Sequence, residues 1–392
     1  MPAKTRGSAF GGPLRSRPRF ARSPTWFSRH TTRPYYHLMN QFQDPILLLN
    51  IVKILILTAC AFIVTFAWTP LLTHFLYKYK LSKKIRNTGT TPIYTKMHKE
   101  KEGTPTMGGL LIWVTALALA YIFFGLSKIV AIPFLEKLNF LSRGQTWLPL
   151  GALVACGLVG LLDDILNVRG LGSKAGGIRV RHKLLIYTAI AAFSAWWFFY
   201  KLGWDVIHVP AVGDFNIGWW YIPIFMFIMV ATSFSVNEAD GLDGLAGGIL
   251  MFCFGAYAVI AFFQGKIELA AFCGVIIGAL LAFLWFNIYP ARFFMGDTGS
   301  MALGATLAIV AMLTNSVLVL PIIAFPLVLE SGSVIIQLIS KKLFKKKVFL
   351  SAPLHHHFEA KGWPEPKVVM RFWVISAICA ALGLVVGLLG RG

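Results

Sequence analysis

The chain has 392 residues, and 37 lysines and arginines against 16 acidic residues give it a formal net charge of +21. Apolar residues make up 57% of it and charged residues only 14%, whereas a soluble domain usually carries about a quarter charged residues. This composition excludes a soluble enzyme, a disordered protein and a secreted disulfide scaffold. We therefore predict an all-α polytopic membrane protein, with lipid as the solvent for much of the chain.

The first 39 residues differ from the rest, because they hold eight lysines and arginines, no acidic residue, and many serines, prolines and glycines. This composition predicts a basic disordered tail at 1–39, followed by one integral membrane domain at 40–392. Three explanations of the tail stay open: a start codon assigned too early, a removable targeting segment, or a genuine basic tail. We favour the first, because Met39 directly precedes the first apolar stretch.

Ten apolar stretches follow, most of them close to the roughly 20 residues that a bilayer-spanning helix needs. They lie at about residues 46–76, 107–125, 146–162, 184–203, 219–236, 244–264, 268–288, 300–314, 317–340 and 370–390. The eighth is short, and the ninth contains Pro321 and Pro326. Loops from an odd span to the next even span hold 22 lysines and arginines against six on the opposite side, which predicts that these loops face the cytoplasm.

Five acidic residues lie at the predicted cytoplasmic ends of odd spans, namely Asp163, Asp164, Asp240, Asp243 and Asp297. Charged groups are costly in so apolar a chain, so their grouping at one membrane boundary indicates a function. Carboxylates that converge without a matching lysine or arginine beside each are typical of a Mg²⁺ site. Two other interpretations are solvated loop acids and the coupling groups of a transporter, for which Glu330 in the ninth span is the best candidate.

Three further segments on the same side carry groups that suit phosphate chemistry. The small-residue loops 103–109 and 295–300 each enter a predicted span, and their backbone N–H groups are expected to bind anions. The string L-H-H-H-F-E at 354–359 adds histidines, of which the first and third would share one side of an extended segment. A zinc site is an alternative, but the acids favour an oxygen-ligated metal and leave the histidines as proton carriers or phosphate donors. Such a site suits phosphoryl transfer between a soluble phosphate compound and a lipid phosphate.

Five strings carry a resemblance to a known family, and they are T-P-T-M-G-G, D-G-L-D-G-L-A, F-F-M-G-D-T-G-S, A-P-L-H-H-H-F-E and P-E-P-K-V-V-M-R-F-W. In this order they resemble the phospho-N-acetylmuramoyl-pentapeptide-transferase family, within the polyprenyl-phosphate N-acetylhexosamine-1-phosphate transferases. The resemblance runs from about residue 45 to 390. It implies a ten-helix enzyme of the bacterial inner membrane, commonly homodimeric, with both termini in the periplasm and the active site facing the cytoplasm.

The resemblance also implies the reaction. Phospho-MurNAc-pentapeptide would pass from UDP-MurNAc-pentapeptide to undecaprenyl phosphate, giving lipid I and UMP in the first membrane step of peptidoglycan synthesis. The cofactor would be Mg²⁺, and no nucleic-acid partner is expected.

The resemblance assigns roles to individual residues of this chain. Asp297 would be the principal metal ligand with Asp164 near the metal, and Asp163 would be either the base that deprotonates the lipid phosphate or a nucleophile. His355 and His356 complete the implied catalytic set, and Phe294 could stack on the uracil. The implied substrate-binding residues are Lys101, Thr106, Lys183, Asn237, Asp240, Gly241, Leu242, Asp243, Asn287, Phe294 and His357.

The chain departs from the family pattern at two places. Asn237 is followed by Glu238 and Ala239, where the family usually has Leu-Thr, and the added charge would weaken nucleotide binding unless Glu238 points away or is paired. Ser351 stands where a basic residue is common. A related enzyme that uses UDP-GlcNAc stays an alternative, although the histidine triplet and the P-E-P-K string argue against it, and an ion or solute transporter is the alternative from a different class.

Overall fold

The computed structural model describes residues 45–82, 101, 103–129, 132–142, 144–172 and 176–390. The basic tail predicted at 1–39 lies outside these residues. The chain divides into two units, residues 1–48 and 49–392, and the description that follows concerns the second unit together with the helix that begins just before it. Within the described residues the regular structure is helical apart from one short hairpin, which confirms the predicted all-α class.

Long apolar helices account for nine of the ten predicted stretches. They are α2 (Pro45–Lys78), α4 (Leu110–Ile129), α6 (Trp147–Val168), α7 (Val180–Trp196), α8 (Tyr221–Ala239), α9 (Leu245–Phe263), α10 (Ile267–Asn287), α11 (Asp297–Leu313) and α15 (Glu365–Leu389). Helix α7 continues into a π-helical turn, η2 (Trp197–Lys201), and a 3₁₀ turn, η3 (Gly218–Trp220), precedes α8. With η2 added to α7 and η3 to α8, all except the 17-residue α11 are long and apolar enough to cross a membrane. The protein is therefore a multi-pass membrane protein.

The predicted ninth span is broken into two parts. The 3₁₀ turn η4 (Val317–Val319) and helix α12 (Leu320–Ile323) are followed by helix α13 (Phe325–Leu343) at an angle of 81°. Pro321 and Pro326 each lie in the first turn of a helix, where the missing N–H costs no hydrogen bond. The two prolines therefore begin two separate helices.

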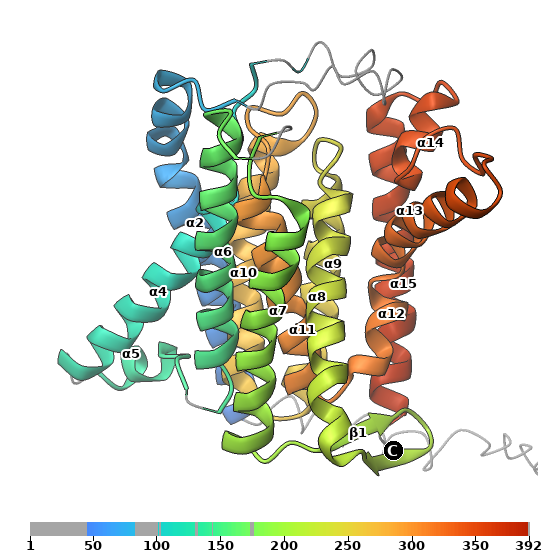
Figure 1. Cartoon of the computed structure of the whole chain (residues 1–392). Coiled ribbons are helices and arrows are strands. Elements are labelled where there is room, and N and C mark those ends of the chain that lie inside the picture. Colours follow the sequence, from blue (N-terminus) through green and yellow to red (C-terminus); the bar gives the residue numbers. More distant parts are fainter. Residues whose placement is uncertain are drawn as a thin grey trace, which may run out of the picture. The chain divides into compact units, whose positions relative to one another are not determined.

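Short elements between the long helices were not predicted. They are α5 (Pro133–Leu138), α14 (Leu354–Ala360) and the antiparallel strands β1 (Val206–Val209) and β2 (Gly213–Asn216), in which Ile207 pairs with Phe215. The expectation of an extended histidine segment is wrong, because α14 makes that segment helical. Figure 1 shows α14 at one end of the bundle and β1 at the opposite end.

Helix α11 forms the centre of the packing, and every one of its residues is buried. Its most extensive contacts are with α6 and α8. Glycines allow these backbones to approach closely: a Cβ at Gly160 would lie 2.3 Å from the Asp297 carbonyl oxygen, and a Cβ at Gly304 would lie 2.6 Å from Ser233 Cα. This contact between α6 and α11 places the first residue of α11 beside the acidic end of α6.

Candidate active site

A lysine joins two of the predicted site carboxylates. Lys183 Nζ, from the first turns of α7, lies 2.7 Å from Asp163 Oδ2 on α6 and 2.5 Å from Asp297 Oδ2 at the start of α11. The two carboxylate side chains are only 2% and 10% exposed, and that of Lys183 is 18% exposed. We call these three residues the Lys183 centre. Its ammonium contradicts the expectation that these acids have no cationic neighbour, and the long lysine side chain bridges two helices.

The two consecutive aspartates of α6 accept hydrogen bonds from different segments. Asp163 Oδ1 accepts a hydrogen bond from the Ile178 N–H, beside Gly177, whose backbone has φ +73°. Asp164 is fully buried, and its Oδ2 accepts the Thr298 N–H at 3.1 Å. That N–H belongs to the first turn of α11, where backbone donors lack partners within the helix and a negative charge is favoured. Asp164 therefore caps α11 from the neighbouring helix.

The two small-residue loops bond to one another. Gly108 N–H donates to the Phe294 carbonyl oxygen at 2.8 Å, and Gly109 N–H donates to that of Met295 at 2.9 Å. Gly296 N–H donates to Asp240 Oδ2 at 3.0 Å. The expectation that these glycine amides bind phosphate is therefore wrong for this structure. The glycines instead allow the two segments to pack closely, because a Cβ at Gly109 would lie 2.2 Å from the α-carbon of Gly299 on α11.

A second lysine also bridges two acids, and we call this group the Lys101 centre. Lys101 Nζ lies 2.6 Å from Asp243 Oδ1 and 2.5 Å from Glu365 Oε1, at the start of α15. Asp243 Oδ2 also accepts the Ala291 N–H at 2.9 Å, and Asp243 N–H donates to Glu365 Oε1 at 2.7 Å. Lys101 Nζ lies 5.7 Å from the centre of the Phe294 ring. The group holds three loops and one helix end together.

The electrostatics of the Lys101 centre favour the charged form of the Lys101 side chain. Burial lowers the pKa of the Lys101 ammonium, but attraction to Asp243 and Glu365 outweighs burial and raises this pKa above its ordinary value. Lys101 therefore stays protonated throughout the neutral range. Sequence reasoning did not assign a role to Glu365, although the string P-E-P-K contains it. An acid in the first turn of a helix is common enough that its sequence position alone does not single it out.

The first histidine of the triplet is held by a buried glutamate. Glu330 on α13 and His355 on α14 are both fully buried, and Glu330 Oε2 lies 3.0 Å from His355 Nδ1 and 3.4 Å from the His355 backbone nitrogen. The Nε2 atom has no hydrogen-bond partner among the described residues. It faces Gly241, where a Cβ would lie only 2.3 Å away. The structure thus places His355 directly against the loop between α8 and α9.

The other two histidines have different environments. His356 is 6% exposed, its Nδ1 lies 2.7 Å from Glu359 Oε2, and its ring centre lies 4.1 Å from that of His355. His357 is more exposed, and its Nδ1 accepts the Leu350 N–H at 3.1 Å. Burial and then the charge of Lys361 lower the pKa of His357, so its imidazole is mostly neutral near pH 7. Of the triplet, only the first two histidines face the interior.

Four of the remaining predicted residues have structural contacts. Asn287 Oδ1 accepts the Gly244 N–H at 3.0 Å and its Nδ2 donates to the Phe293 carbonyl at 2.8 Å, so the amide fixes two loops. Leu242 and Thr106 are buried, and Asn237 Nδ2 donates to a serine hydroxyl of α11.

The extra acid of this chain, Glu238, is paired with a neighbouring helix. Glu238 Oε2 accepts a hydrogen bond from the Ser331 hydroxyl of α13 at 2.5 Å. Glu238 is therefore paired with α13, the helix that carries Glu330, and its effect on nucleotide binding stays a prediction.

The fold and the site together define a multi-pass membrane protein with two buried lysine–carboxylate centres at the helix ends. Comparison with known proteins agrees with this class, because the model of Glycosyl transferase family 4 matches residues 146–315, which run from the start of α6 to the end of α11. A signature described as phospho-N-acetylmuramoyl-pentapeptide-transferase signature 1 matches residues 101–112, which begin at Lys101.

Sequence similarity to known proteins identifies one family within this class. A phospho-N-acetylmuramoyl-pentapeptide-transferase of Chloroflexus aggregans is 39% identical over 357 residues, which cover 88% of this chain and 92% of that protein. Proteins of the same name from Geobacillus thermodenitrificans and Thermoanaerobacter pseudethanolicus are 39% and 38% identical, and each match covers 84% of this chain and 97% of the relative. The chain belongs to the phospho-N-acetylmuramoyl-pentapeptide-transferase family.

Proposed function

We propose that this transferase moves phospho-MurNAc-pentapeptide from UDP-MurNAc-pentapeptide to undecaprenyl phosphate, giving lipid I and UMP. The Lys183 centre carries the proposal, because it gathers the acids that the family resemblance assigns to catalysis at one end of the helices. The bias of lysines and arginines toward the loops at this end supports a cytoplasmic active site in the bacterial inner membrane. We also propose that the enzyme works as a homodimer.

We further propose that the enzyme uses Mg²⁺. The donor set fits this ion, because Asp163, Asp164 and Asp297 offer hard carboxylate oxygens from two helices, and two of them already share a cationic group at 2.5–2.7 Å. Within the described part of the chain, no group of three or more metal-ligating side chains lies close enough to hold an ion. Lys183 Nζ lies between two of the carboxylates, so this ammonium would have to move before Mg²⁺ could bind there. Asp297 and Asp164 would hold Mg²⁺, which neutralises diphosphate charge when bound.

The residues of the Lys183 centre have the chemistry that the transfer needs. A carboxylate of Asp163 can either take a proton from the lipid phosphate or attack the diphosphate as a nucleophile, and both roles stay open. Lys183, released from an aspartate, would neutralise a phosphate oxygen as negative charge moves to the departing UMP. Its position between the two acids keeps it within reach of either.

The Lys101 centre suits the nucleotide. Phe294 presents an aromatic ring for the uracil, and because Lys101 lies over one face of that ring, the base would stack on the other. Asp240 and Asp243 lie at the end of α8 and in the loop that follows, where their carboxylates also fix backbone N–H groups. A diphosphate next to this group would draw Lys101 away from Glu365.

Glu330 provides a role for His355. Because a carboxylate accepts hydrogen bonds, its contact with Nδ1 places the hydrogen on that nitrogen and directs Nε2 toward the loop of Gly241. We infer that Glu330 orients His355, which positions this loop and, when Nε2 also carries a proton, would neutralise charge on the diphosphate. A transporter would instead need Glu330 on a conduction path, and its buried pairing with a histidine does not favour that.

Product formation tests the proposed reaction. Purified full-length protein receives undecaprenyl phosphate, Mg²⁺ and either UDP-MurNAc-pentapeptide or UDP-GlcNAc, and lipid product and UMP are measured together. We expect lipid I and UMP from the first donor only, and neither without a divalent cation. Turnover of UDP-GlcNAc instead would replace this function with the related transferase. Ion or solute flux in proteoliposomes that survives Asp297→Asn, without UMP release, would support a transporter.

A further inference from the structure

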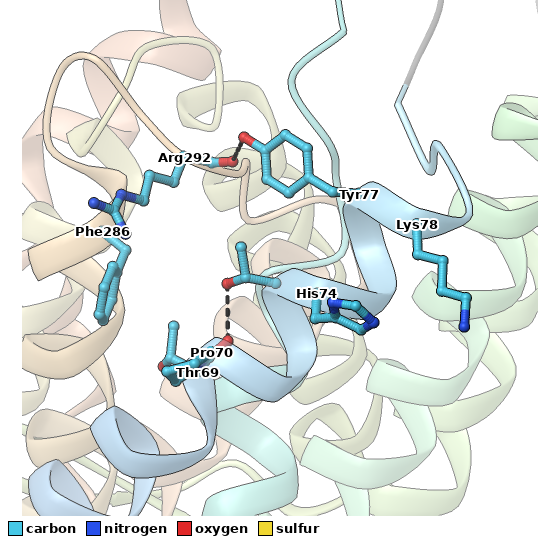
Figure 2. Close-up of a pocket in the computed structure, with 8 residues that line it drawn as sticks. Thr69, Pro70, His74, Tyr77, Lys78, Phe286 and Arg292 are labelled. Atoms are coloured by element: carbon cyan, nitrogen blue, oxygen red, sulfur yellow. Dashed lines mark hydrogen bonds between the residues drawn. The ribbon is translucent and has the colours of Figure 1, made fainter.

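A pocket of about 670 Å³ lies outside both lysine centres, where the last turns of α2 meet the loop that follows α10. Figure 2 shows Tyr77 and Arg292 meeting above the pocket and Phe286 beside the Arg292 side chain. None of the residues assigned to the proposed reaction lines it. The pocket therefore has no role in the transfer step described above.

The lining of the pocket is basic. His74 and Lys78 are four residues apart and so share one side of α2, and Arg292 approaches from the loop. The Arg292 guanidinium lies 5.6 Å from the centre of the Phe286 ring. No acidic side chain lines the pocket, and within the described ranges none forms an ion pair with Lys78 or Arg292. The positive charge here is not balanced by those parts of the protein.

The loop and the helix are joined at the pocket. The Tyr77 hydroxyl donates to the Arg292 backbone carbonyl at 2.8 Å, which holds the arginine at the end of α2 without using its guanidinium. Thr69 and Thr73 hydroxyls already donate to carbonyls one turn earlier, so the donors left for an anion are those of the basic side chains. The guanidinium is thus positioned by the backbone and is available for an anion.

The same part of α2 also carries exposed apolar side chains. Leu71 and Phe75 are 58% and 44% exposed on a helix long and apolar enough to span a membrane. Basic groups at the end of such a span lie at the level of lipid headgroups. A ligand that fits both features has an anionic phosphate for the pocket and apolar chains for the helix surface.

We propose that this pocket holds the phosphate headgroup of an anionic bilayer phospholipid, whose acyl chains lie along the exposed side of α2. The lining contains neither the carboxylates nor the buried histidines of the active site, so it has no groups that would act on a lipid phosphate. The occupant is therefore a resident lipid rather than the reacting lipid substrate. This inference does not depend on the reaction proposed above.

Lipid binding to the full chain, measured by native mass spectrometry in detergent, tests the proposal. The probes are phosphatidylglycerol, phosphatidylcholine and undecaprenyl phosphate. We compare the wild type with Lys78→Gln/Arg292→Gln and with a matched control, Lys341→Gln/Lys342→Gln, which removes two exposed lysines from the end of α13. We expect phosphatidylglycerol affinity to fall about 30-fold in the pocket variant, at about 1 kcal/mol for each cation removed from beside the headgroup, and to stay near wild type in the control, whose two lysines do not line the pocket.

Two further readouts separate a lost site from a damaged fold. The variant Lys78→Arg/Arg292→Lys keeps both charges and is expected to keep phosphatidylglycerol binding, and phosphatidylcholine should bind all variants alike. Unchanged phosphatidylglycerol affinity in the glutamine variant would overturn the proposal. Selective loss of undecaprenyl phosphate would assign the pocket to the substrate instead, and loss of a dimer without a change in lipid binding would assign it to a second copy of the chain.

Discussion

The Lys183 and Lys101 centres each consist of one lysine between two buried carboxylates, yet they join different kinds of element. Lys183 connects α6, α7 and α11, and the backbones of α6 and α11 approach closely where Gly160 meets Asp297. Lys101 connects loops to the start of α15, and its acids also accept backbone N–H groups. An ammonium group held between rigid helix ends, as in the Lys183 centre, is suited to catalysis. An ammonium group held between loops, as in the Lys101 centre, mainly fixes the positions of the loops.

The largest effect is expected at the Lys183 centre. Asp297→Asn keeps the size of the side chain but removes its charge, so a cation and the diphosphate lose a ligand worth several kcal/mol. We expect kcat to fall about 1,000-fold with little change in thermal stability. Lipid I formation and thermal unfolding in detergent are the measurements. Asp205→Asn, next to the hairpin at the other end, is the matched control. A near-normal rate in Asp297→Asn would remove the metal assignment.

The Lys101 centre should respond differently. Lys101→Met leaves Asp243 and Glu365 buried without a cation, and loss of one partner of a buried pair is strongly destabilising. We expect a lower unfolding temperature and a KM for the UDP substrate raised about tenfold, a loss of 1.4 kcal/mol in binding. Adding Glu365→Gln removes one of the two stranded charges, so it should restore part of the stability but not the KM. Equal recovery of both would show that Lys101 acts only on the fold.

A smaller effect is expected at Glu330. Glu330→Gln keeps an oxygen that can accept the His355 Nδ1 hydrogen, whereas Glu330→Ala removes it. We expect kcat to fall about tenfold in the alanine variant and less in glutamine, with KM changed little, because the orientation of His355 and not substrate affinity depends on this contact. Parallel losses of kcat and protein yield in both variants would indicate a purely structural role.

The smallest effect is expected at Glu238. Because this side chain bonds to Ser331 on α13 and not to the nucleotide loops, Glu238→Leu should leave the KM for the UDP substrate within about twofold of wild type, as for a residue outside the binding contacts. Steady-state kinetics at saturating lipid measures this. A large drop in KM on removal of the charge would show that Glu238 repels the substrate after all.

Much of the fold could be predicted because lipid makes hydropathy a strong signal: each of the ten apolar stretches became a helix or, at Pro321 and Pro326, two helices. The 81° bend could not be predicted, since a proline in a first turn begins a helix and a proline in the interior kinks one, and the sequence does not say which applies. The elements α5, α14 and the hairpin are too short to leave a periodic pattern.

For the candidate site, the convergence of two acids was predictable but their pairing with a lysine was not. That Asp163 and Asp297 converge followed from the alternation of span directions, which puts both at one membrane boundary. Their bridge to Lys183 depends on a long side chain that reaches between helices, and sequence spacing does not encode that reach. The prediction that Gly108 and Gly109 bind an anion was wrong for a related reason. A residue without a side chain suits close packing as well as it suits anion binding.

The length of α11 has a consequence for where the reaction takes place. A helix of 17 residues rises about 25 Å, against a hydrocarbon core of about 30 Å. Its far end lies next to the hairpin, since the neighbouring Asn315 accepts a hydrogen bond from the His208 N–H. Asp297, at its near end, therefore lies less than one hydrocarbon thickness from the hairpin end of the bundle. In the proposed reaction, this geometry would bring the aqueous nucleotide down to the depth of the lipid phosphate, so that the lipid would not have to rise into water.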